Sequence, residues 1–243
     1  MPLCAGGYGW LGRVTPQQGR CSINESLRQG RYICTILLAD ISGYTSFLDS
    51  VRLAHQDDAF ADGQIPDAYA MMSSFLEGIA SVIDPPFNVV KFEGDAAFAV
   101  APDDITPRGA AMLDLISKCY QDFVDRRSAA GLIWTCTCNA CSRKETLDLK
   151  FVVHHGEYFV QTVGSQIEVV GPDVNIAHRL LKNAAAELVG SSGYGLFTEA
   201  TTDALTLPLS DAASLTETID GEQPITTRVI PLRERPTTSS FRR

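Results

Sequence analysis

Apolar residues recur along the chain at spacings that predict one folded unit between residues 31 and 232. Tyr32–Ala39 is an unbroken apolar run of strand length, typical of a buried strand, and it ends at Asp40. Ser42 and Gly43 break this strand and begin a short helix, and residues 55–66 are predicted to form a loop. In residues 67–83 apolar positions fall on one helical face.

Two glycines are expected at turns between strands, Gly94 and Gly156. The remaining predicted elements are, in chain order, strands at 87–93 and 95–101, a helix from 106, strands at 147–155 and 158–163, an extended segment at 167–170, a helix over 173–188, a strand at 195–197, a short helix and a closing strand at 226–232. This order predicts an α+β domain with the ferredoxin-like split βαβ (βαββαβ) topology and extensions.

Composition and charge restrict the function classes. The net charge of −9 and the pI of about 4.9 disfavour a nucleic-acid binder and a protein that binds anionic membranes. No stretch approaches the roughly 20 apolar residues of a membrane span, and the N-terminus lacks a signal-peptide pattern. The seven cysteines are odd in number and unevenly spread, which disfavours a framework of disulfide bonds. We therefore expect a reduced, cytoplasmic protein. Residues 1–30 are expected to form a flexible arm and residues 233–243 a disordered tail.

Two aspartates lie at positions that suit metal ligands. Asp40 ends the first strand, and Asp95 follows Gly94 at the tip of a hairpin that lies beside this strand in a ferredoxin-like sheet. Paired carboxylates suit Mg²⁺, and the Ser42-Gly43 backbone could approach a phosphate closely. The alternative is that both aspartates only cap turns.

The helix predicted from Asp173 carries a second candidate group. Asn175, Arg179 and Lys182 share one face, where they could donate hydrogen bonds to phosphate oxygens. The alternative is an ordinary solvated helix face.

Three thiols lie within six residues of an insert at about 130–146: Cys136, Cys138 and Cys141. Such spacing can bind Zn²⁺, but a structural site needs four ligands and none adjacent supplies the fourth. Cys119, His154 or His155 are candidates for it. A loop of reduced thiols and a redox-sensitive hairpin are the alternatives.

Four segments together resemble class III nucleotidyl (adenylate/guanylate) cyclases, and more specifically a little-characterised bacterial offshoot of that clan. They are Leu38–Thr45 (LADISGYT), Lys91–Asp95 (KFEGD), His154–Glu157 (HHGE) and Glu168–Arg179 (EVVGPDVNIAHR). Each is similar to a family motif, and they occur in the family's order. The resemblance covers about residues 32–232, whereas the cysteine insert is foreign to ordinary cyclases.

The resemblance implies a role for each matching residue. Asp40 and Asp95, with the carbonyl of Ile41, would hold two Mg²⁺ or Mn²⁺ ions. Lys91 and Glu168 would read the base, and the lysine favours ATP over GTP.

Asn175 would orient the ribose and Arg179 would stabilise the transferring phosphoryl group. The family places the metal aspartates and these residues in different subunits, so the resemblance implies a head-to-tail homodimer. The implied activity is conversion of ATP to cyclic AMP and pyrophosphate. The alternatives are a catalytically silent nucleotide-binding or interaction module on the same fold, and a zinc-stabilised scaffold unrelated to nucleotides.

Overall fold

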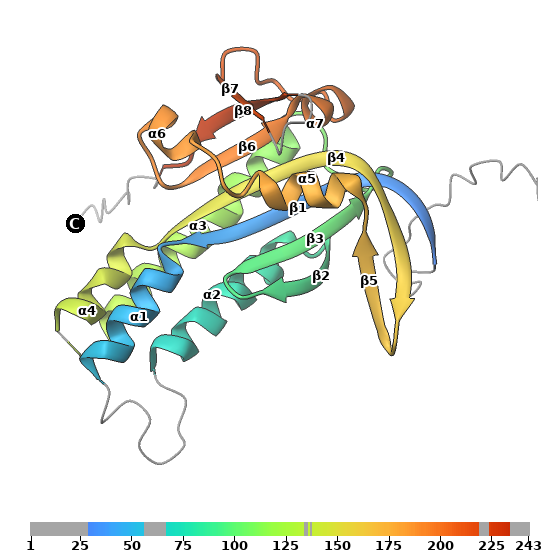
Figure 1. Ribbon diagram of the computed structural model, residues 1–243. Coiled ribbons are helices and arrows are strands. Elements are labelled where there is room, and N and C mark those ends of the chain that lie inside the picture. The colour runs from blue at the N-terminus through green and yellow to red at the C-terminus, as the bar shows by residue number, and fades with distance from the viewer. Residues whose placement is uncertain (1–28, 56–66, 134–135, 137, 219–223, 234–243) are drawn as a thin grey trace, which may run out of the picture.

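The computed structural model describes residues 29–55, 67–133, 136, 138–218 and 224–233 (Figure 1). Its strands are β1 (Gly30–Ser42), β2 (Asn88–Glu93), β3 (Ala96–Pro102), β4 (Asp148–Val163), β5 (Gln166–Val170), β6 (Tyr194–Thr198), β7 (Ala213–Glu217) and β8 (Ile225–Pro231). Its helices are α1 (Tyr44–Ala54), α2 (Asp67–Ile83), α3 (Ala110–Ile133), α4 (Asn139–Ser142), the 3₁₀ helix η2 (Arg143–Thr146), α5 (Pro172–Arg179), α6 (Ala185–Val189) and α7 (Glu199–Ala204). No helix in these ranges is long and apolar enough to cross a membrane.

The centre of the sheet confirms the predicted α+β, split βαβ topology. Strand order is β2-β3-β1-β4, every neighbouring pair is antiparallel, and the helices between β1 and β2 and between β3 and β4 complete the unit. The sheet then extends from β4 through β6 and β8 to β7, while β5 pairs with the far end of β4. The β4–β5 hairpin projects at the opposite end of the molecule from α1 and α4 (Figure 1).

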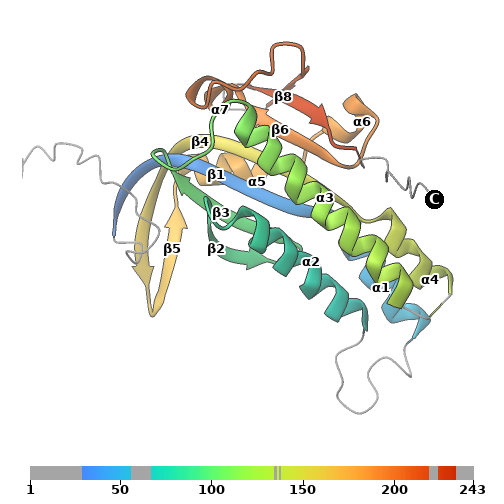
Figure 2. The same ribbon diagram turned by 180° about the vertical axis from the view of Figure 1, so that it is seen from behind.

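The middle of strand β1, residues 36–39, is apolar without interruption because both faces of the strand are covered there. Leu37 and Ile41 belong to the core that includes buried residues of α2 and α3, the two helices in front of the sheet in Figure 2. Ile36 and Leu38 face the other core, which includes Val174 of α5. A strand buried on both faces cannot alternate apolar with polar residues, which explains the run seen in the sequence.

The turn predicted at Gly156 is wrong, because β4 continues through this residue. Gly156 lies opposite Cys34 within the β1–β4 ladder. A Cβ atom on Gly156 would lie 2.4 Å from Cγ of Asp173 in the first turn of α5. Asp173 in turn accepts a hydrogen bond from the backbone N–H of Glu157, at 2.6 Å. The glycine therefore allows α5 to pack closely on the strand, and it does not reverse the chain.

The single helix predicted over 173–188 is also wrong. Helix α5 ends at Arg179, and α6 begins at Ala185. Between them the Asn183 side chain donates to the carbonyl of Leu180 at 2.6 Å and accepts from the N–H of Ala185 at 2.7 Å. These local bonds replace helical ones, so Lys182 does not continue the face of α5.

Other predictions differ from the structure or fall outside it. Strand β7 was not predicted, and it is a short strand at the end of the sheet order. Helix α3 extends to Ile133, into the range predicted as the insert. The predicted arm (except residues 29 and 30), the loop after His55 and the tail beyond Arg233 lie outside the described residues.

Candidate functional site

The two candidate metal ligands lie at one place in the sheet. Asp40 is in β1, opposite Ala96 of β3, and Asp95 directly precedes β3. The N–H of Ile41 donates to the carbonyl of Asp95 at 3.1 Å, which holds the hairpin turn against β1. Burial raises the pKa of the Asp95 carboxyl, and the nearby Asp40 carboxylate raises it further. The two negative charges therefore repel each other, and a bound divalent cation would relieve that repulsion.

A lysine that the sequence did not single out binds Asp40. Lys150 lies opposite Asp40 in the β1–β4 ladder, and its Nζ is 2.8 Å from Oδ2 of Asp40. The same ammonium donates to the carbonyl of Leu181, at 3.2 Å. The side chains of Lys150 and Asp40 are only 18% and 13% exposed, so the ion pair is largely withdrawn from solvent. A lysine between the apolar residues Leu149 and Phe151 of the predicted strand 147–155 was the signal that could have identified Lys150.

The turn after β1 presents backbone donors beside the acidic pair. Gly43 has a φ of +86°, a conformation that glycine adopts readily, and it stands at the N-cap of α1. Among the described residues, no side chain forms a capping hydrogen bond at this N-terminal end of α1. The first N–H groups of an α-helix lack helical partners and, with the helix dipole, attract anions. Ser42-Gly43 and the start of α1 thus form a candidate phosphate site.

The two predicted base-reading residues contact each other. The Nζ atom of Lys91, on β2, lies 3.3 Å from Oε2 of Glu168 on β5 and 2.9 Å from Oε1 of Glu93. The hydrogen bond to Glu93 raises the pKa of Lys91, so this ammonium stays charged. Nδ1 of His178, on α5, is 3.3 Å from the other carboxylate oxygen of Glu93. Three elements thus meet around one lysine.

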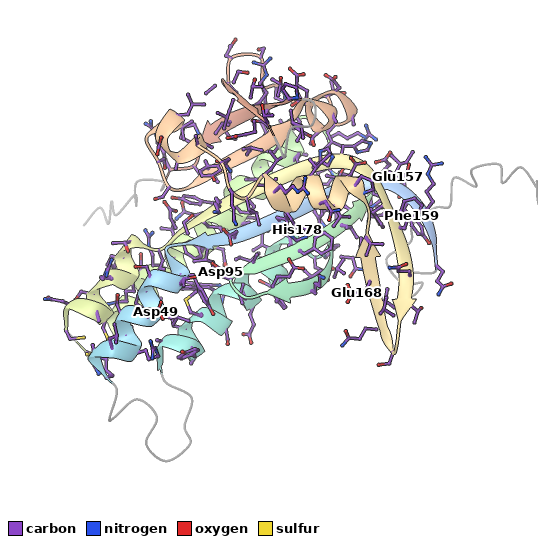
Figure 3. All side chains as sticks on the ribbon, in the orientation of Figure 1. Asp49, Asp95, Glu157, Phe159, Glu168 and His178 are labelled. Atoms are coloured by element: carbon purple, nitrogen blue, oxygen red, sulfur yellow. The ribbon has the colours of Figure 1, made fainter. Side chains whose placement is uncertain are left out.

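The remaining predicted residues, Asn175 and Arg179, are exposed on α5, one helical turn apart. Figure 3 shows the acidic pair, marked by Asp95, well separated from Glu168 on the β4–β5 hairpin. One chain therefore holds an acidic group and a polar base-reading group that it does not bring together. The catalytic roles of Asn175 and Arg179 stay predictions.

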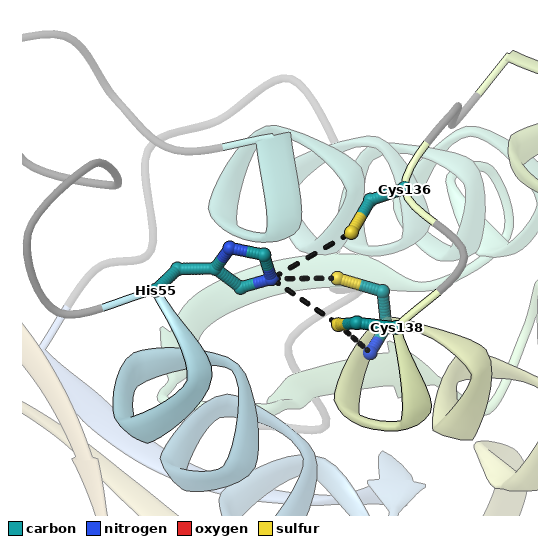
Figure 4. A group of neighbouring side chains, drawn as sticks. His55, Cys136 and Cys138 are labelled. Carbon is teal, nitrogen blue, oxygen red and sulfur yellow. Dashed lines mark hydrogen bonds between the residues drawn. The ribbon is translucent and has the colours of Figure 1, made fainter.

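The three insert cysteines do come together, but with a histidine that was not predicted. The Sγ atoms of Cys136, Cys138 and Cys141 face Nε2 of His55, at the end of α1 (Figure 4). The backbone N–H of Cys141 donates to Sγ of Cys138 and lowers the pKa of that thiol to about 6.

The predicted sources of a fourth ligand are wrong. Cys119 is buried in the core, and burial raises the pKa of its thiol to about 12. His154 is buried between Thr198 and Asp173. His155 lies 3.4 Å from Oγ1 of Thr35 on the neighbouring strand. The sequence did not predict His55 as a ligand, because this residue is 81 positions from Cys136 and forms no known motif with it.

Comparison with known proteins identifies the fold. The solved guanylyl cyclase Cya2 aligns over 87% of this chain and 98% of its own, with a TM-score of 0.62 and 16% identity. A bacterial light-regulated adenylyl cyclase aligns over 84% of this chain and 54% of its own, with a TM-score of 0.60 and 13% identity. The chain has the class III nucleotidyl cyclase fold. At sequence identities of 16% and 13%, this structural similarity establishes the fold alone.

Sequence comparison gives two further matches for this cyclase-fold chain. A family model described as "Protein of unknown function (DUF2652)" matches residues 72–188. "Uncharacterized protein Rv2561/Rv2562" from Mycobacterium tuberculosis is 38% identical over 114 residues, which are 46% of this chain. The match spans about half the length of that relative, 51%.

Proposed function

We propose that the protein is an adenylate cyclase that converts ATP to cyclic AMP and pyrophosphate. The observation that carries this proposal is the placement of two carboxylates, Asp40 and Asp95, together where β1 meets the hairpin turn, beside the uncapped start of α1. Both aspartates and the Ile41 carbonyl would hold the metal ions. Bound Mg²⁺ or Mn²⁺ would activate the ribose 3′-hydroxyl for attack on the α-phosphate and neutralise charge on the triphosphate.

The chain's own donors would position the triphosphate. The Ser42-Gly43 backbone and the first turn of α1 offer N–H groups, and Lys150 offers an ammonium within 2.8 Å of Asp40. When a cation binds Asp40, Lys150 would lose its carboxylate partner and could bind a phosphate oxygen instead. Positive charge near the leaving pyrophosphate would stabilise the transition state.

Lys91 and Glu168 would recognise adenine. An ammonium can donate to a ring nitrogen of adenine, and a carboxylate can accept from its exocyclic amine. The contact between Lys91 and Glu168 supports a shared recognition role, because it places a donor and an acceptor side by side. Guanine presents a carbonyl where adenine has the amine, so Glu168 favours ATP.

We further propose a head-to-tail homodimer with two composite sites. Asn175 and Arg179 of one protomer would orient the ribose and stabilise the phosphoryl group at the acidic pair of its partner. The separation of Asp95 from the proposed base-reading residue Glu168 within one chain supports this arrangement (Figure 3). Large apolar side chains near the base-reading group are exposed and would suit an interface: Phe92, Phe159, Val163 and Ile167. Reduced thiols and ATP both favour a cytoplasmic location.

One observation favours a second function, a nucleotide-binding module without turnover. Lys150 already neutralises Asp40, and a cation must displace this ion pair before it can bind. If the displacement is too costly, the cyclase fold would bind ATP without forming product.

The test is cyclic AMP formation by the purified chain with Mn²⁺ and ATP, quantified by mass spectrometry. Asp95→Asn should lower the rate at least about 100-fold, because it removes a metal ligand. Asp49→Asn is the matched control, since Asp49 is an exposed carboxylate on α1 and its loss should leave the rate unchanged. ATP binding without product from the wild type would favour the silent module, and absence of ATP binding would refute both functions.

A further inference from the structure

Four potential ligands converge at the end of the molecule where α1 lies beside α4. Nε2 of His55 is 3.3 Å from Sγ of Cys138, 3.4 Å from Sγ of Cys141 and 3.7 Å from Sγ of Cys136 (Figure 4). All four ligand atoms lie within 4.8 Å of one another. This cluster is separate from the acidic pair and from the base-reading group, and the proposed cyclase chemistry does not use it.

Hydrogen bonding alone does not account for the cluster. Nε2 of a histidine carries either one proton or one lone pair, so it can satisfy only one sulfur at a time. Here three sulfurs face that single atom. A central cation explains the arrangement, since Zn–N bonds of about 2.05 Å and Zn–S bonds of 2.3 Å place nitrogen and sulfur about 3.6 Å apart in a tetrahedron. The three observed distances lie around this value.

We propose that His55, Cys136, Cys138 and Cys141 form a structural zinc site. One imidazole and three thiolates make a closed tetrahedral set with no position for water, which is typical of structural rather than catalytic zinc. Sulfur-rich ligands also select zinc over Mg²⁺ and Mn²⁺, which prefer oxygen. The N–H of Cys141 that donates to Sγ of Cys138 supplies the outer hydrogen bond that orients a thiolate ligand.

The zinc would join two segments that lead directly into the candidate nucleotide site. His55 ends α1, the helix that follows the Ser42-Gly43 turn. The cysteines lie just before β4, which carries Lys150. A hydrogen bond of 2.9 Å between Arg143 of η2 and Ser50 of α1 links the same two segments. The metal would therefore fix α1 against the start of β4, and its binding energy would become folding energy.

The experiment measures metal content and coordination in the full chain. Protein expressed with zinc and purified without chelator is expected to hold about one zinc per chain by elemental analysis. Cobalt substituted for zinc should give the intense visible bands of tetrahedral Co²⁺ together with thiolate-to-cobalt charge transfer. Removing the zinc with a chelator should lower the melting temperature by about 10 °C, and adding it back should restore it.

Matched variants locate the metal. Cys138→Ser is expected to reduce zinc to below about a tenth of the wild-type content, whereas His55→Cys should retain it as a four-cysteine site. Cys119→Ala, which removes a buried thiol outside the cluster, should keep full zinc content. Asp95→Asn should keep it as well, which separates this site from the proposed cyclase metals.

Four results would overturn the zinc site. The first three are a zinc-free wild type from zinc-supplemented expression, full zinc content in Cys138→Ser, and an octahedral cobalt spectrum. A disulfide between two of the cluster thiols in freshly isolated protein would also overturn it, in favour of a redox role. If Cys138→Ser folds poorly, the zinc content of the wild type and of His55→Cys still decides the outcome. None of these readouts depends on cyclase activity.

Discussion

Replacing Asp40 or Asp95 by asparagine is expected to change the stability of the cation-free chain differently. Asp40→Asn removes the charge partner of Lys150, whose side chain is only 18% exposed. Breaking a fully buried ion pair costs about 3–5 kcal/mol. Here the amide oxygen can still accept from Lys150, and both side chains reach solvent, so a loss of about 2 kcal/mol is expected.

Asp95→Asn is expected to have a much smaller effect on stability. Burial and the Asp40 carboxylate raise the pKa of Asp95, so the folded state disfavours its charge. The neutral amide removes this repulsion, and stability without added divalent cation should change by no more than about 0.5 kcal/mol, or rise slightly.

Urea denaturation with and without Mn²⁺ measures both effects. The wild type should gain stability with Mn²⁺, whereas Asp95→Asn should gain little, since it has lost a ligand. The reasoning is refuted if Asp95→Asn is more than about 1 kcal/mol less stable than wild type without Mn²⁺, or if Mn²⁺ stabilises both proteins equally.

Three further predictions follow from other contacts. Gly156→Ala should destabilise the chain by about 1–3 kcal/mol in urea denaturation, because the new Cβ would lie 2.4 Å from Cγ of Asp173. Burial lowers the pKa of His154, so the unfolded chain binds a proton more readily, and stability should fall as the pH drops below about 6.5. His154→Gln should flatten that part of the pH profile, and an unchanged slope would contradict this assignment. Lys91→Glu should weaken ATP binding by at least about tenfold in calorimetry, since it places a third carboxylate beside Glu93 and Glu168; unchanged affinity would exclude Lys91 from base recognition.

The elements that the sequence predicts well are those whose pattern depends on burial alone. The apolar run of β1 and the one-sided pattern of α2, which spans Asp67–Ile83 as expected, follow from their place in the core. The hairpin at Gly94 was also predictable, because its short strands and single glycine form a local signal.

The errors arise at two residues whose contacts override the local pattern, one with a partner distant in the sequence and one with its own neighbours. Gly156 has the pattern of a turn, but it is small because Asp173 approaches it from α5. Asn183 interrupts the predicted helix through bonds to its neighbours, which apolar periodicity does not register.

The same limit applies to the sites. Motifs predicted Asp40, Asp95, Lys91 and Glu168 as candidate site residues, because motifs depend on local sequence. Lys150 and His55 became visible only when strand pairing and helix packing brought them to their partners.

The most direct test of the composite cyclase site is complementation between two inactive variants. Asp95→Asn lacks a metal ligand and Arg179→Ala lacks the proposed transition-state donor, so each homodimer should be inactive with Mn²⁺ and ATP. Mixing them in equal amounts and allowing exchange makes half of the dimers mixed, each with one intact site, and should restore about a quarter of wild-type cyclic AMP formation. A mixture that stays at the background of the separate variants, while the wild type is active and exchange is confirmed, would contradict a site shared between two chains.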